Sequence, residues 1–95
     1  MEIEVKRVDD NNFVVNVREG NSQTEHRVSF DDEYYKTLIS SSGTRAGEIS
    51  KEKLIEKSFE FLLRREPKES ILSSFDMRVI KRYFPEYERE IKKEL

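Results

Sequence analysis

The chain has 95 residues, 35% of them hydrophobic and 40% charged, with a formal net charge of −2 at pH 7 and no cysteine. This length predicts a single domain over residues 1–95 with one modest core, and apolar runs of only two or three residues exclude a membrane-spanning helix. Without cysteine or a recognisable secretory signal, disulfide and thiolate chemistry are excluded and a cytoplasmic location is expected.

Residues 1–30 alternate between apolar and polar side chains, which is the pattern of strands with one buried face. Clusters of turn-forming residues at 9–12 and 19–22 divide this region into three segments. In the second segment, for example, Phe13 and Val15 share one face. The region therefore predicts a three-stranded antiparallel meander.

From Tyr34 onward the apolar residues recur every three or four positions, which is the helical period. Asp31 or Asp32 is expected to cap a first short helix, because aspartate is a favoured N-cap residue. The serine- and glycine-rich stretch over about 40–48 is expected to be a flexible loop. Residues 31–95 are thus predicted to be mainly helical.

The main helix is expected to begin at Ser50 and to end near Pro67. Its apolar side chains, from Leu54 through Phe59 to Leu63, cover an arc of roughly 200° on a helical wheel. One packing partner needs only about half of that arc. The helix is therefore predicted to be central, with the sheet on one side and later helices on the other.

Three shorter helical segments are expected after Pro67: one over 70–75, one over 77–84 capped by Asp76, and a charged tail helix with Pro85 at its first position. The predicted fold is α+β, a three-stranded antiparallel β-meander followed by a helical C-terminal half packed on one sheet face. The expected core comprises Ile3, Val5, Phe13, Val15, Val17, Val28, Phe30, Leu38, Leu54, Ile55, Phe59, Leu62, Ile71, Leu72, Phe75, Ile80 and Phe84.

No pattern in the sequence indicates a catalytic site, a metal site or a cofactor, and the chain is not expected to be an enzyme. His26 lies on the apolar side of its strand and is expected to be hydrogen bonded there, since no nucleophile or carboxylate stands at a useful spacing. The acidic turns at 9–12 and 31–33 lack the spacing of a calcium loop. Residues 40–45 lack the order of a phosphate-binding loop.

The tyrosines, together with a narrow apolar stripe of Tyr87, Ile91 and Leu95 on the tail helix, give the strongest indication of function. A tyrosine joins an apolar ring to a polar hydroxyl and is enriched in interfaces, although packing at the edge of the core is an equally simple explanation. A non-enzymatic protein-interaction module is therefore predicted, which binds an unidentified protein or a second copy of the chain. Its candidate interface residues are Tyr34, Tyr35, Tyr83, Tyr87, Ile91 and Leu95.

Nucleic-acid binding is the alternative, because residues 64–82 carry six basic and three acidic side chains. A helical basic face of this kind could lie along phosphates, or it could simply be solvated. The acidic pI of 5.5 favours the solvated face. The candidate contacts are Arg64, Arg65, Lys68, Arg78, Lys81 and Arg82.

The stretch KSFEFLLRREP at 57–67, followed by SIL at 70–72, FD at 75–76 and RYFPEY at 82–87, resembles a pattern in short prokaryotic hypothetical proteins of about this length. The similarity covers roughly residues 50–91, with a looser match at 31–35. This resemblance implies a free-standing small protein, and it implies no activity, cofactor or site residue.

Overall fold

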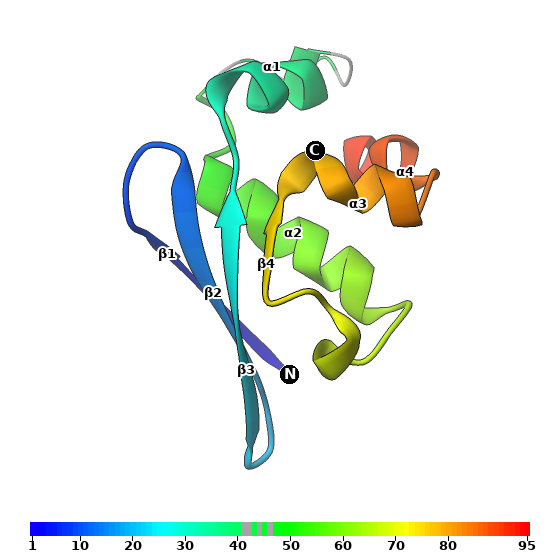
Figure 1. Ribbon diagram of the computed structural model, residues 1–95. Coiled ribbons are helices and arrows are strands. Elements are labelled where there is room, and N and C mark those ends of the chain that lie inside the picture. Colours follow the sequence, from blue (N-terminus) through cyan, green and yellow to red (C-terminus); the bar gives the residue numbers. More distant parts are fainter. Residues whose placement is uncertain (41–42, 44, 46) are drawn as a thin grey trace.

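The computed structural model describes residues 1–40, 43, 45 and 47–95, and within them one mixed sheet carries helices on one face (Figure 1). The strands, in their order across the sheet, are β1 (Glu2–Arg7), β2 (Asn12–Glu19), β3 (Ser22–Ser29) and β4 (Ser74–Asp76). The first three pair antiparallel, and β4 pairs parallel to β3. The predicted single α+β domain is confirmed, while the prediction of only three antiparallel strands is wrong by one parallel edge strand.

The helices of the described residues follow β3 and surround β4 in the chain. They are α1 (Asp32–Ser40), α2 (Lys51–Leu63), α3 (Ile80–Tyr83) and α4 (Tyr87–Lys93), with single 3₁₀ turns η1 (Lys68–Ser70) and η2 (Met77–Val79). The helical turn expected over 70–75 is wrong, because this segment leaves η1 as extended chain and becomes β4. Positions 41, 42, 44 and 46 of the loop expected at 40–48 lie outside the described residues.

The expected caps are confirmed by their hydrogen bonds. Asp31 Oδ1 accepts from the Tyr34 amide at 2.8 Å, and Ser50 Oγ accepts from the Lys53 amide at 3.1 Å. Asp76 Oδ1 accepts from the Arg78 amide at 2.9 Å, where it caps η2. Each of these bonds satisfies an amide that has no partner within its own helical turn.

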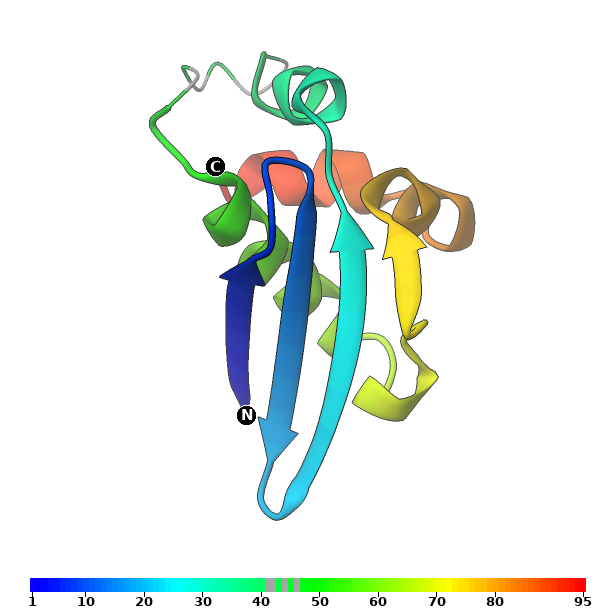
Figure 2. The same cartoon turned by 60° about the vertical axis from the view of Figure 1, so that its left-hand side comes forward.

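The sheet is apolar on the face that the helices cover and polar on the other, as its alternating sequence predicts. On the covered face Val15 is paired with Val5 and His26 in the neighbouring strands. On the outer face Asn16 is paired with Glu4 and Glu25 instead. Figure 2 shows the outer face with no helix in front of it.

Helix α2 packs against the sheet and against α4, which confirms its predicted central position. Towards the sheet, the Phe59 ring lies 5.3 Å from His26 and 6.0 Å from Phe75, measured between ring centroids. Towards α4, the Phe61 ring lies 5.3 Å from the Tyr87 ring. The broad apolar arc of α2 is therefore explained by two packing partners.

Most of the expected core is buried, with one clear exception. Leu72 is 46% exposed, because the extended chain turns the neighbouring Ile71 inward and Leu72 outward. The core also includes residues that were not expected in it. These are Tyr34, Ile39, Phe61, Met77, Tyr87 and Ile91.

We expect Phe59→Ala to lower the free energy of unfolding by about 3–5 kcal/mol, because it removes a fully buried ring between α2 and the sheet. The measurement is equilibrium chemical denaturation. Glu60→Ala, at the exposed neighbouring position, is the control and should cost less than about 0.5 kcal/mol. A loss below about 1 kcal/mol for Phe59→Ala would show that α2 is not central to stability.

Candidate functional site

The six basic residues expected to contact nucleic acid do not form one free surface. Arg78 makes a two-bond ion pair with Asp31, with N–O distances of 2.8 and 2.9 Å, and its guanidinium lies over the Tyr34 ring. Lys81 also lies near that ring, and its ammonium is 3.6 Å from Glu88. Arg78 therefore joins η2 to the start of α1, and Lys81 joins α3 to α1 and α4.

Two basic side chains near the end of α2 also contact other residues of the chain. Arg65 lies 3.6 Å above the Phe61 ring and 3.4 Å from Glu86. Lys68 is buried, and its ammonium is 2.7 Å from Glu69 Oε2.

The two remaining candidate bases are more exposed. Arg64 is 3.6 Å from Glu94, in an ion pair that is open to solvent. Arg82 is exposed, and no ion pair joins it to another residue in the described part of the chain.

Three of the six residues predicted to form an interface are not accessible to a partner, so the prediction is wrong for them. Tyr34, Tyr87 and Ile91 are buried in the core, because α4 packs between α1, α2 and α3 instead of lying on the surface. Tyr87 contacts Ser58 through its hydroxyl at 2.7 Å, and burial raises the pKa of that hydroxyl. Burial, together with a hydrogen bond to Glu88, also raises the pKa of Tyr34.

The other members of that set remain at the surface to different degrees. Tyr35 is partly buried, and its hydroxyl donates to the Ile49 carbonyl. Leu95 is also partly buried against the core. Tyr83 is 65% exposed, and it is the member that lies on a concave surface.

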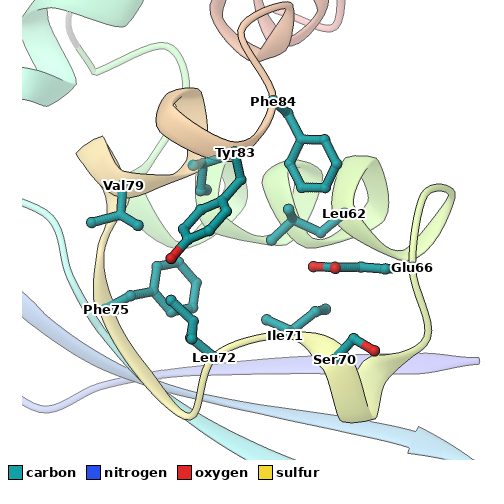
Figure 3. A pocket seen from close by; sticks show the side chains of 10 residues that line it. Leu62, Glu66, Ser70, Ile71, Leu72, Phe75, Val79, Tyr83 and Phe84 are labelled. Atoms are coloured by element: carbon teal, nitrogen blue, oxygen red, sulfur yellow. The ribbon is translucent and has the colours of Figure 1, made fainter.

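That surface is an apolar groove of about 250 Å³ between the end of α2, the segment that leads into β4, and α3 (Figure 3). We call it the Tyr83 groove, and its main lining residues are Leu62, Glu66, Ile71, Leu72, Phe75 and Tyr83. Tyr83 and Leu72 approach it from opposite sides, and both side chains are substantially exposed. The groove thus offers apolar surface that the folded chain does not cover itself.

The wall that carries Leu72 is held to β3 by two hydrogen bonds. His26 Nδ1 lies 2.8 Å from the Leu72 carbonyl oxygen, which can only accept, so Nδ1 carries the hydrogen. Its Nε2 lies 2.9 Å from the Thr24 hydroxyl. One residue on, the Ser73 carbonyl accepts from the Arg27 amide at 2.8 Å. The expected structural role of His26 is confirmed, and it fixes one side of the groove.

Glu66 is the one charged side chain that lines the Tyr83 groove. It is partly buried, and no ion pair or side-chain hydrogen bond joins it to another described residue. Figure 3 shows its carboxylate directed into the groove between Leu62 and Ile71. The groove therefore combines apolar walls with a negative charge at one end.

A second hollow, of about 490 Å³, lies by the β1–β2 turn and the end of β4, and both of its carboxylates already have hydrogen-bond partners. Asp9 there accepts from the Asn11 and Asn12 amides at 2.9 Å, and Asp76 accepts from Ser29 at 2.7 Å. Among the described residues no group of three or more potential metal-ligating side chains comes together. The Tyr83 groove is therefore the better candidate site.

Tyr83 is among the interface residues expected from the sequence, whereas Leu72 was expected in the core and Glu66 was assigned no role. One signal was available, since Ile71 and Leu72 are adjacent and an extended chain can bury only one of two neighbours. The position of Glu66 had no such signal, because the end of α2 becomes the rim of a groove only when the 70–75 segment and α3 lie on either side of it.

Comparisons with protein-family models, with curated proteins and with solved structures gave no match. The resemblance to short prokaryotic proteins therefore stays a prediction. Each helix in the described part of the chain is too short and too polar to cross a bilayer.

We expect Asp31→Asn to reduce stability at neutral pH and to have less effect in acid. The Arg78 guanidinium, followed by the Tyr34 amide, holds the pKa of the Asp31 carboxyl below its ordinary value of 3.8. The stabilisation by this ion pair is therefore complete above that value and is lost as the pH falls through the lower folded-state pKa. Asparagine keeps an N-cap acceptor, so the variant removes mainly the charge.

The measurement is urea denaturation of both proteins from neutral pH to about pH 3, where free carboxyls become protonated. Glu25→Gln, on the exposed outer face of the sheet, is the control for loss of one negative charge. A stability difference for Asp31→Asn that does not change with pH would contradict a contribution from the ion pair.

Proposed function

We propose that this chain is a non-enzymatic protein-interaction module that binds a segment of a partner protein in the Tyr83 groove. The observation that carries the proposal is the pair of exposed apolar side chains facing this groove, Leu72 at 46% and Tyr83 at 65% exposure. Contiguous apolar surface around a concavity is typical of sites where another molecule is bound.

The size of the groove favours a peptide segment over a metabolite or cofactor. Sites for small molecules usually enclose about 300–1,000 Å³ and bury most of the ligand. The Tyr83 groove measures about 250 Å³ and is open along one side, since Leu72 and Tyr83 are exposed. It is suited to one apolar anchor side chain that projects from a larger partner.

The groove is also preorganised for binding. The hydrogen bonds from His26 and from the Arg27 amide fix the 71–73 segment, and Ile71 and Ile80 are buried beneath it. A partner would not have to order this wall on binding, which lowers the entropic cost of association.

Nucleic-acid binding has less support as the alternative function. Of the six candidate bases, Arg65, Arg78 and Lys81 contact both an aromatic ring and a carboxylate, and Lys68 is buried. Moving such a cation to a phosphate would break these contacts. Arg64 and Arg82 alone would supply few phosphate contacts.

We expect Leu72→Ser and Tyr83→Ser, separately and together, to abolish capture of a partner while leaving the fold intact. Both side chains are exposed, so their loss should change the free energy of unfolding by less than about 1 kcal/mol. The measurement is affinity capture from a lysate of the native host, treated with nuclease. Val8→Ser is the matched control, because Val8 is 65% exposed but lies outside the Tyr83 groove.

A protein retained by wild type and by Val8→Ser, and lost from all three groove variants, would support the proposal. Equal capture by all five proteins would contradict it. Size-exclusion chromatography with light scattering, run on the same variants, tests whether the partner is a second copy of the chain.

We expect labelled oligonucleotides to bind weakly or not at all at low salt. Binding through phosphates weakens steeply as salt concentration rises, because counterions are released on association. Tight, salt-sensitive binding that is reduced in Arg82→Gln would instead favour the nucleic-acid alternative.

A further inference from the structure

Resting on this proposed function, we infer that the Tyr83 groove selects a peptide segment in which a lysine or arginine flanks an apolar anchor residue. The anchor would lie between Leu72 and Tyr83, and the cation would pair with Glu66. The proposed function requires only apolar contacts in the groove. This inference adds the charge of the partner segment and names Glu66 as the residue that recognises it.

Glu66 is available for such a pair because the cations next to it in the chain are occupied. Arg64 lies 3.6 Å from Glu94, and Arg65 is held by Phe61 and Glu86. Lys68, two positions after Glu66, is buried with its ammonium 2.7 Å from Glu69. Within the described residues no cation neutralises Glu66.

The end of α2 adds to the negative potential at this rim of the groove. The helix ends at Leu63, and the Glu66 amide folds back to donate to the Leu62 carbonyl at 2.9 Å. The C-terminal end of a helix carries partial negative charge, which stabilises cations nearby. The helix end and the carboxylate therefore favour the same sign of charge in the partner.

Desolvation makes this charge a source of specificity. A partner that fills the apolar groove removes water from Glu66, and an unpaired buried carboxylate is costly. A lysine or arginine would compensate that cost with a charge-assisted hydrogen bond, whereas a glutamate at the same place would add repulsion. The aliphatic stem of either basic side chain could also cover apolar wall.

The test uses ¹⁵N-labelled protein and synthetic heptapeptides with a central leucine or phenylalanine, followed by lysine in one set and by glutamate in the other. Chemical shifts give both the affinity and the place of binding. We expect the lysine peptides to shift groove resonances and to bind wild type roughly tenfold more tightly than the glutamate peptides. Glu66→Gln should bring this ratio close to one.

Glu60→Gln is the matched control, because Glu60 is an exposed residue of α2 outside the groove and its change removes the same charge. The tenfold ratio should persist in that variant. Equal binding of both peptide sets to wild type, with shifts in the groove, would overturn the inference but leave the proposed function standing. No shift in the groove with any peptide at millimolar concentration would overturn both.

Discussion

Helix α2 is stable in this fold only because two of its faces are buried at once. Phe59 packs on the sheet through His26 and Phe75, while Phe61 packs on α4 through Tyr87. The polar contact at the second face is complete, since Tyr87 contacts the Ser58 hydroxyl, which donates to the Leu54 carbonyl. A 13-residue helix with this arc of apolar side chains is not stable alone in water, so its stability depends on the sheet and the C-terminal helices that pack around it.

Several of the charged residues join elements that are distant in sequence. Arg7 of β1 makes two hydrogen bonds to Glu52 of α2, at 2.9 and 3.1 Å. Lys51 is buried with its ammonium 2.8 Å from the Asp10 carbonyl, beside the β1–β2 turn. A local excess of basic residues therefore does not indicate a binding face here. The informative charge is Glu66, for which the described residues provide no counterion.

The strands in residues 1–30 and the central helix α2 could be predicted from the sequence, because the spacing of their apolar residues is regular over many positions. The strand β4 could not be predicted in this way, because three residues are too few to show a period. Its extended conformation depends on pairing with Val28 and its neighbours in β3. The spacing of Tyr87 and Ile91 predicted one apolar face of a helix. It did not show that this face is buried within the chain, because the spacing does not identify the surface that packs against it. The groove depends on how the end of α2, the 70–75 segment and α3 are placed together, and the sequence does not show this arrangement. Of its lining residues, Tyr83 was predicted as an interface residue, and the adjacent pair Ile71 and Leu72 gave the only other signal.

The parallel pairing of β3 with β4 also bears on the order in which the chain folds. It joins residues 47 positions apart, as in the bond from Ser29 to Asp76, whereas β1, β2 and β3 are neighbours linked by short turns. Closing a long loop costs entropy before its contacts form, so we expect the hairpins to form early and β4 to dock late. Local opening in the native state should then begin at this edge, which is the edge that carries the groove. A bound partner would hold that edge closed and would slow exchange of its amide hydrogens.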